Sequence, residues 1–309
     1  MLDARAVGRL LDPDTARASQ REAFLRLAGA GAGAGDLHKL TLPGEGAAPV
    51  VAFLGRGAPH EGVVCKLVGV PDPATVPPGA ASIGGIVVVL HPESGRPLAV
   101  LDGASVTAVR TAAGTAVAVD ALAGPDVRRL AVLGTGVAGL AHARALGDLR
   151  GWERIVLWNR TGSRAAEAAD ELELPCPIEV AGTPEEAVRG ADVVCACTTG
   201  VVPVVLGAAL APGTLVTSIA SARPGRCELD PEALARAALV IDHAVHAPPD
   251  RPFVELASVL GGTRVEAPPD GVIAYLSGGL PIQDALAAAA IIERAAREGG
   301  VPTIALDVP

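Results

Sequence analysis

Hydrophobic residues follow two different rhythms along this chain. In the first third, short apolar segments alternate with turns rich in Gly, Pro and Ser, which predicts the strands of a sheet. These segments are residues 37–42, 50–54, 63–70, 83–90 and 97–102. Apolar positions at helical spacing predict helices around them, over residues 10–27, 105–123 and 281–298.

From residue 128 onward, strands and helices alternate. The predicted strands are residues 130–133, 155–158, 178–180, 193–197, 215–219 and 239–241. Helices are expected after the first strand and over residues 163–172, 184–189 and 231–237. Alternation of this kind is typical of a doubly wound parallel sheet, so we predict an α/β protein with a Rossmann domain. Gly124-Pro125-Asp126 ends the helix before it and marks a domain boundary.

A glycine-rich turn joins the strand at 130–133 to the following helix. Gly134 permits a tight turn, Gly136 allows backbone to approach a pyrophosphate, and Gly139 allows the helix to pack closely on the strand. The helix N-terminus then offers free N–H groups to that anion. A packing turn without a ligand is the alternative. The strand–turn–helix context favours dinucleotide binding.

The end of the next strand predicts which dinucleotide is bound. A site for NAD carries Asp or Glu about twenty residues after the turn, where it accepts from the ribose 2′-OH. Here that place holds Asn159, followed by Arg160 and Arg164. Because Arg pairs with a 2′-phosphate and a carboxylate repels it, we expect NADPH (NADP) in preference to NADH.

Further polar residues follow later strands of the predicted sheet. Thr198 and Thr199 stand after the strand at 193–197, where they would line the cofactor ribose or form an ordinary polar loop. The residues predicted to bind the cofactor are Gly134, Thr135, Gly136, Val137, Ala138, Gly139, Asn159, Arg160, Thr161, Arg164, Thr198, Thr199 and Ser218.

Composition narrows the class of protein. The formal net charge of −9 argues against binding to nucleic acid or to an anionic membrane. The uncharged run at 193–222 is divided by Gly and Pro, so we do not expect a membrane span. The N-terminus lacks the apolar stretch of a signal peptide, and the five cysteines and six histidines show no metal-type spacing. We expect a cytoplasmic protein without a metal.

Three cations stand in apolar surroundings within the first third. Lys66 lies inside Val63-Val64-Cys65-Lys66-Leu67-Val68, Arg110 lies in an otherwise uncharged helix, and Lys39 interrupts a strand. A buried charge needs a partner. For Arg110 that partner is either an anionic ligand or a carboxylate distant in sequence.

Several of these segments together resemble the ornithine cyclodeaminase/mu-crystallin family over nearly the whole chain. The matching segments are Gly62-Val63-Val64-Cys65-Lys66-Leu67-Val68, Thr107-Ala108-Val109-Arg110-Thr111-Ala112-Ala113, the glycine turn, Pro224-Gly225-Arg226-Cys227-Glu228-Leu229-Asp230 and Ser277-Gly278-Gly279-Leu280-Pro281-Ile282-Gln283-Asp284. The resemblance implies a homodimer whose chain ends form an α+β substrate-binding and dimerisation domain. We therefore assign residues 1–120 and 283–309 to that domain and residues 121–282 to the Rossmann domain.

The resemblance also implies roles for single residues. Lys39, Lys66 and Arg110 would hold the carboxylate of an amino or imino acid, with Lys66 and Arg110 as the catalytic pair. Asp284 would face the cofactor or the substrate amine, or serve as a plain helix cap. The Trp158-Asn159-Arg160-Thr161 ending resembles the NADPH-dependent mu-crystallin and ketimine reductase branch.

One departure from the family pattern favours a particular reaction. Cyclodeaminases and the related alanine dehydrogenase carry Asp just ahead of the Pro-Gly segment, where this chain has Ala222. Deamination of a neutral substrate needs a proton acceptor near the amine, whereas reduction of a protonated imine does not. We predict an NADPH-dependent oxidoreductase of amino-acid metabolism, an imine reductase that forms an α-amino or cyclic imino acid.

Two other functions stay open on the sequence alone. One is an ornithine or lysine cyclodeaminase, or an amino-acid dehydrogenase, using NAD. The other is a non-catalytic protein that binds NADPH and a small ligand, as mu-crystallins do. The Pro-x-x-Asn turn usual after the lysine strand is altered to Pro71-Asp72-Pro73, which leaves the preferred substrate side chain open.

Overall fold

The computed structural model describes residues 1–28, 37–44, 48–57, 61–71, 84–199, 201–220, 227–248 and 250–299. The chain forms two compact units: unit 1 is Met1–Arg110 with Leu280–Pro309, and unit 2 is Thr111–Gly279. Helix α3 (Gly103–Leu122) begins in unit 1 and ends in unit 2, so the first division between the units lies inside this helix.

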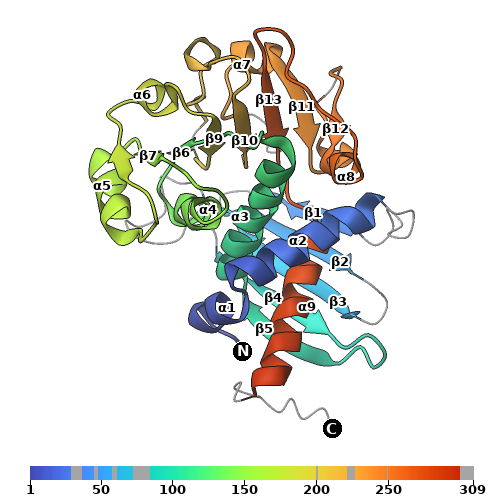
Figure 1. Cartoon of the computed structure of the whole chain (residues 1–309). Helices are drawn as coiled ribbons and strands as arrows, with labels where there is room; N and C mark the ends of the chain where they lie inside the picture. The colour runs from blue at the N-terminus through green and yellow to red at the C-terminus, as the bar shows by residue number, and fades with distance from the viewer. Residues whose placement is uncertain are drawn as a thin grey trace. The chain divides into compact units, whose positions relative to one another are not determined.

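Unit 1 contains a five-stranded antiparallel sheet in the order β1-β2-β3-β4-β5. Its strands are β1 (Leu37–Leu42), β2 (Val50–Arg56), β3 (Val63–Gly69), β4 (Gly84–Leu90) and β5 (Pro97–Asp102). Figure 1 shows α9 (Pro281–Glu298) across this sheet, with α2 (Pro13–Ala28) beside it. The sequence predicts these strands and α9 correctly, to within two residues at each end.

The helix predicted over residues 10–27 corresponds to α2, which begins three residues later, and the sequence does not predict the short helix α1 (Ala4–Leu10) ahead of it. Asp12 accepts a hydrogen bond from the backbone N–H of Thr15 at 2.9 Å and so caps α2. Pro13 occupies the first position of α2, where its missing N–H costs nothing, but it cannot continue a helix from α1. The break therefore follows from the local sequence Asp12-Pro13.

Side chains on β3 alternate between the two faces of the sheet. Val64, Lys66 and Val68 are buried on the face that α9 covers, whereas Leu67 is 40% exposed on the other face. Gly55 on β2 permits the close approach of α9, because a Cβ at this position would come within 2.6 Å of the Pro281 side chain. The strand period of two thus places one charged residue, Lys66, in the apolar interior.

Unit 2 contains an eight-stranded sheet in the order β12-β11-β13-β10-β9-β6-β7-β8, and its strand pairs are parallel. The strands are β6 (Arg129–Leu133), β7 (Arg154–Trp158), β8 (Ile178–Val180), β9 (Val193–Ala196), β10 (Leu215–Ser218), β11 (Ala237–Ile241), β12 (Val254–Glu255) and β13 (Val272–Leu276). The helices are α4 (Val137–Gly147), α5 (Gly162–Glu171), α6 (Pro184–Val188), α7 (Pro231–Ala235) and α8 (Leu256–Leu260). This is the predicted doubly wound Rossmann sheet, with strand order reversing on either side of β6.

Strands β12 and β13 and helix α8 are not among the elements that the sequence predicts. Strand β13 inserts between β10 and β11, so it is central in the sheet although it comes last in the chain. All five of its residues, Val-Ile-Ala-Tyr-Leu, are buried, and a short continuous apolar run of this kind shows no period.

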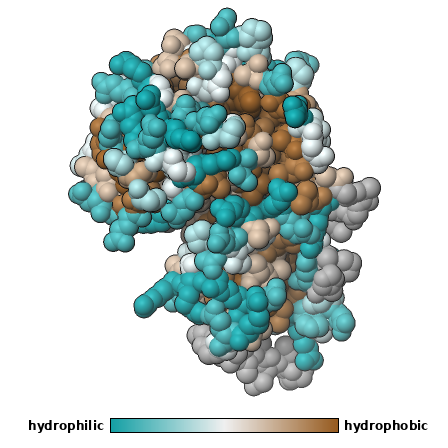
Figure 2. Space-filling model, viewed as in Figure 1, coloured by the Kyte–Doolittle hydropathy of each residue, from teal (hydrophilic) through white to brown (hydrophobic). Residues whose placement is uncertain are grey.

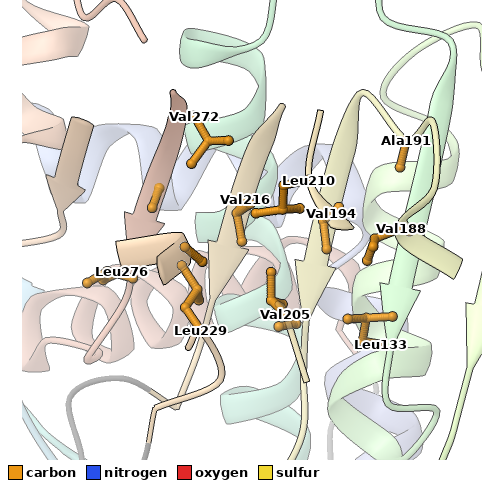
Figure 3. Packing of buried hydrophobic residues seen from close by; sticks show 14 of the residues in the cluster. Leu133, Val188, Ala191, Val194, Val205, Leu210, Val216, Leu229, Val272 and Leu276 are labelled. Carbon is orange, nitrogen blue, oxygen red and sulfur yellow. The ribbon is translucent and has the colours of Figure 1, made fainter. Parts of the chain in front are cut away.

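Alternate residues of the central strands form an apolar core on one face of the unit 2 sheet. Leu133 of β6, Val194 of β9, Val216 of β10 and Leu276 of β13 belong to this cluster, and so does Val188 of α6 (Figure 3). Burial of one such Val or Leu side chain contributes about 1.5–3 kcal/mol, so these residues fix the sheet register. Figure 2 shows hydrophilic side chains spread over the outer surface of both units, with hydrophobic ones visible between them. None of the described helices is long and apolar enough to span a membrane.

Candidate functional site

The glycine turn after β6 has the geometry of a dinucleotide-binding loop. Gly134 has a φ of +97°, and a Cβ there would lie 2.6 Å from the carbonyl oxygen of Cys197. A Cβ at Gly139 would overlap the carbonyl oxygen of Gly134. Gly136 differs, because a Cβ built on it meets nothing within 4 Å. Two glycines are therefore required by the fold, while the third leaves open space at the start of α4.

Helix α4 begins directly at this open space. Gly136 is its N-cap residue and has no side chain to satisfy the first N–H groups. Val137, the next residue, is 53% exposed. The positive end of the helix dipole and its N–H groups are thus available to an anion such as a pyrophosphate.

The end of β7 is tied to the glycine turn by a short polar chain. The Asn159 amide donates to the Thr135 hydroxyl at 3.0 Å, and that hydroxyl donates to the backbone carbonyl of Arg164 at 3.1 Å. Arg160, Thr161 and Arg164 are exposed around this point. The predicted cofactor residues of the turn and of the β7 end therefore lie together, with two guanidinium groups at the surface and no carboxylate at position 159.

Two other predicted cofactor residues have hydroxyl groups that are engaged elsewhere. The hydroxyls of Thr198 and Ser218 donate to the carboxylate of Glu228, at 2.7 and 2.8 Å, and the backbone N–H groups of Thr198, Ile219 and Ala220 do the same. Glu228 is 1% exposed. It holds the loops after β9 and β10 in place, so Thr198 and Ser218 shape this edge of the sheet through Glu228. Thr199 is exposed on the same loop.

A second buried carboxylate anchors the last loop at the same edge. Asp242, directly after β11, accepts hydrogen bonds from the N–H groups of Gly278 and Gly279, at 2.7 and 2.8 Å, and lies 2.7 Å from Nδ1 of His246. Burial by itself raises the pKa of the Asp242 carboxyl, but these hydrogen bonds together hold that pKa below its usual value. Only 10% of the His246 side chain is exposed, although it lies in a short stretch next to a proline-containing loop.

In unit 1, three neighbouring strands place Lys39, Phe53 and Lys66 in one row across the sheet. Lys39 of β1 is opposite Phe53 of β2, and Phe53 is opposite Lys66 of β3. The Nζ atoms of Lys66 and Lys39 lie 4.1 and 5.1 Å from the centroid of the Phe53 ring. Lys66 is fully buried and Lys39 is exposed, so the row leads from the surface into the interior.

Asp284, on the first turns of α9, pairs with both buried cations. Nζ of Lys66 lies 2.7 Å from its carboxylate, and Nε of Arg110 donates to it at 3.0 Å. All three side chains are at most 5% exposed. The N-cap of α9 is Leu280, so Asp284 is not a helix cap. Arg110 thus has a carboxylate partner distant in sequence, one of the two possibilities that the sequence leaves open.

The electrostatics of this cluster are unbalanced when Lys66 is protonated. Two cations then face one carboxylate, which leaves a net charge of about +1 in a buried setting. Burial, followed by the charge of Arg110, lowers the pKa of Lys66 to about 7, against the opposing effect of Asp284. The cluster can therefore accept an anion, and Lys66 can exchange a proton near neutral pH.

A sequence model of the ornithine cyclodeaminase/mu-crystallin family matches residues 60–299. The chain belongs to this family. Within it, a mouse (Mus musculus) ketimine reductase mu-crystallin is 30% identical to this chain over 65% of the chain. The matched part covers 66% of the mouse protein, slightly less than two thirds of its length. A Bacillus cereus Δ1-pyrroline-2-carboxylate reductase is 30% identical over 72% of this chain and 74% of its own length.

The fold agrees with solved structures of such proteins. The Thermococcus litoralis Δ1-pyrroline-2-carboxylate reductase, in complex with NADH and L-proline, is 24% identical and superimposes with a TM-score of 0.90 over 98% of this chain and 99% of its own. At this identity the likeness establishes the fold, namely a Rossmann-type parallel sheet with a separate antiparallel sheet.

Two glutamines that extend the hydrogen bonds of the buried charged cluster in unit 1 are not among the site residues that the sequence predicts. Gln283 accepts from the N–H of Leu280 at 2.9 Å and from Arg110 at 3.4 Å, and Gln20 donates to the backbone carbonyl of Gln283 at 3.1 Å. Gln20 is fully buried, and a polar residue inside an otherwise amphipathic helix was the available signal. Position 222, where the family Asp is replaced, and positions 72 and 73 lie outside the described residues.

Proposed function

We propose that this chain reduces the imine of a 2-keto acid to an α-amino or cyclic imino acid with a reduced nicotinamide cofactor. The observation that carries the proposal is the buried group of Lys66, Arg110 and Asp284, in which two cations share one carboxylate. An α-imino acid brings the missing negative charge with its own carboxylate. The family relatives, a ketimine reductase and a pyrroline-2-carboxylate reductase, act on substrates of this chemistry.

The residues of unit 2 fit a nicotinamide dinucleotide. The open space at Gly136 and the uncapped N-terminus of α4 suit a pyrophosphate. Arg160 and Arg164 beside the neutral Asn159 support NADPH over NADH, because a 2′-phosphate gains charge-assisted hydrogen bonds there. When bound, the nicotinamide supplies the hydride.

The substrate roles are divided among the cations of unit 1. Arg110, with its planar fork of donors, would clamp the substrate carboxylate, and Lys39 would assist from the exposed end of the row. Lys66 would lie near the C=N group and pass a proton to its nitrogen, for which a pKa of about 7 is suited. Asp284 would hold both cations in position. Ala222 in place of the family Asp supports reduction over deamination.

The test is a turnover assay with purified protein. NADPH oxidation would be followed with Δ1-pyrroline-2-carboxylate, Δ1-piperideine-2-carboxylate, and pyruvate plus an amine. We expect turnover with at least one of these, and its loss in Arg110→Met. Ammonia release from ornithine or lysine without imine reduction would replace the proposal with a cyclodeaminase. NADPH binding without any turnover would replace it with a non-catalytic binding protein.

Cofactor preference is tested separately at the end of β7. Arg160→Ala should raise the Kd for NADPH about tenfold or more, the loss expected for a charge-assisted hydrogen bond, while the Kd for NADH stays unchanged. Arg189→Ala is the matched control, since Arg189 is an exposed arginine that precedes the amino end of β9, whereas Arg160 follows the carboxyl end of β7. An equal effect on NADH and NADPH would contradict the 2′-phosphate assignment.

We also propose that the protein is a homodimer joined through the open face of the unit 1 sheet. Leu40, Ala52, Leu67 and Ile86 stand opposite one another across four strands, and Leu40, Leu67 and Ile86 are 59%, 40% and 42% exposed. A contiguous apolar face of this kind is typical of a protein–protein interface. A second copy would cover it with an equally apolar surface.

The cellular setting that we infer is the cytoplasm. All five cysteines are free thiols, as is usual in a reducing compartment. The proposed substrates place the enzyme in amino-acid metabolism.

A further inference from the structure

Three soft ligand atoms meet beneath the glycine turn, on the face of the unit 2 sheet opposite the apolar core of Figure 3. Cys195 and Cys197 alternate at the end of β9, so both thiols point to the same side, and their Sγ atoms are 3.5 Å apart. His142 of α4 lies against them, and the ligand atoms of all three residues are within 4.8 Å of one another. His142 and Cys195 are fully buried, and Cys197 is 6% exposed.

The histidine ring is already oriented as a metal ligand requires. Nδ1 of His142 lies 2.6 Å from the backbone carbonyl oxygen of Ala138, to which it donates. Because that nitrogen carries the proton, Nε2 presents a lone pair toward the interior. Metal-binding histidines are commonly fixed in this way, with the second ring nitrogen bonded to a backbone carbonyl. In the structure that lone pair accepts a hydrogen bond from the hydroxyl of Thr115 on α3 at 3.0 Å, so the hydroxyl oxygen lies beside Nε2 as a fourth ligand atom for an ion that displaces this hydrogen bond.

Two edges of a tetrahedral site are nearly formed. With zinc–sulfur bonds of about 2.3 Å, the two sulfurs of a tetrahedral site lie about 3.8 Å apart, close to the 3.5 Å found here. With zinc–nitrogen and zinc–oxygen bonds of about 2.0–2.1 Å, those two ligands lie about 3.3 Å apart, close to the 3.0 Å between Nε2 and the Thr115 hydroxyl. Small side-chain rotations that bring the two sulfurs closer to Nε2 and the Thr115 oxygen would complete the tetrahedron.

Charge selects the ion. Two thiolates and a neutral imidazole carry a charge of −2, so a divalent ion gives a neutral cluster, whereas Cu(I) would leave a buried negative charge. Both cysteines are free thiols. Binding of one Zn²⁺ would form two Zn–S bonds, one Zn–N bond and one Zn–O bond to the neutral Thr115 hydroxyl, and the two thiols would release their two protons to solvent.

We propose that Cys195, Cys197 and His142, with the Thr115 hydroxyl, form a structural zinc site under the dinucleotide loop. The site would join α4, α3 and β9 at the point where the loop needs rigidity. His142 bonds to Ala138 in the first turn of α4, and the carbonyl oxygen of Cys197 packs against Gly134. Since the ligands are buried, the ion would enter as the chain folds.

The experiment is metal analysis of the full chain produced in medium supplemented with Zn²⁺ or with Co²⁺. We expect about one ion per chain after gel filtration in the presence of a weak chelator, as for a closed structural site. Co²⁺-loaded protein should show a thiolate-to-cobalt charge-transfer band and the intense visible bands of tetrahedral coordination. The Tm of the loaded protein should exceed that of protein made in metal-depleted medium.

Variants separate this site from adventitious binding. Cys195→Ser and Cys197→Ser should each lose the ion and the cobalt bands, while Cys176→Ser and Cys227→Ser, at partly exposed thiols outside the cluster, should keep both. The proposal is overturned if wild-type protein contains no ion after production in zinc or cobalt medium. It is also overturned if Cys195→Ser and Cys197→Ser bind as much metal as Cys227→Ser, which would identify an adventitious ion. The wild-type result decides the matter even if a cluster variant does not fold.

Discussion

Removing the charge of Asp284 tests the electrostatic balance of the buried cluster most directly. In Asp284→Asn, Lys66 and Arg110 keep their positions but lose the carboxylate that lies 2.7 and 3.0 Å from them. Removing one partner of a buried ion pair costs about 3–5 kcal/mol, because a charge is left uncompensated in the interior. With a urea slope of about 2 kcal/mol/M, the unfolding midpoint of unit 1 should fall by about 2 M.

The cost should also depend on pH in a defined direction. Asp284 raises the pKa of Lys66, so its removal moves that pKa further below about 7. At pH values between the lowered pKa of Lys66 in the variant and about 7, Lys66 is protonated in the folded wild type and neutral in the folded variant. The stability of the variant therefore rises faster with pH in this window, and the difference between the two proteins is largest at acidic pH.

Urea unfolding at pH 6 and pH 8 measures both effects. Both tryptophans, Trp152 and Trp158, lie in unit 2, so fluorescence reports that unit, while far-ultraviolet circular dichroism reports both. Glu22→Gln is the control: its ion pair with Arg26 is half-exposed, and its loss should cost only about 0.3–0.5 kcal/mol. If Asp284→Asn is no less stable at pH 6 than this control, the three charges are not a balanced buried group and the reasoning is wrong.

Three further outcomes are expected. Gly139→Ala should lower the Tm of unit 2, because the new Cβ would overlap the carbonyl oxygen of Gly134. Gly136→Ala should keep the wild-type Tm and weaken dinucleotide binding, because a Cβ at that position meets no other atom within 4 Å. Equal losses of Tm for the two variants in thermal melts would contradict this difference. If Lys66 acts in its protonated form, the KM for the imine should rise in steady-state assays as the pH passes above about 7. Lys66→Met should abolish this pH dependence. A wild-type KM that does not change with pH would exclude the role. Leu67→Asp on the open sheet face should shift the sedimentation coefficient from dimer to monomer, and an unchanged coefficient would place any interface elsewhere.

The local sequence determined most of the secondary structure and the class of the fold. Helix α9 begins and ends where its apolar period and Pro281 place it. The glycine turn is recognisable from a short motif, in which Gly134 and Gly139 are required by the backbone geometry and Gly136 leaves open space. The misses have local explanations too. Strand β13 carries no alternation, and Asp12-Pro13 starts α2 three residues after the beginning of the predicted helix.

The partners of the charged residues were decided only by the tertiary structure. Lys66 and Arg110 stand out in the sequence as cations without nearby acids, but Asp284 lies 218 and 174 residues away from them along the chain. Glu228, Asp242 and the group of His142 with two cysteines are likewise assembled from separate strands and loops. A sequence shows that a buried charge needs a partner. Which residue provides that partner depends on long-range packing, and no local pattern carries that information.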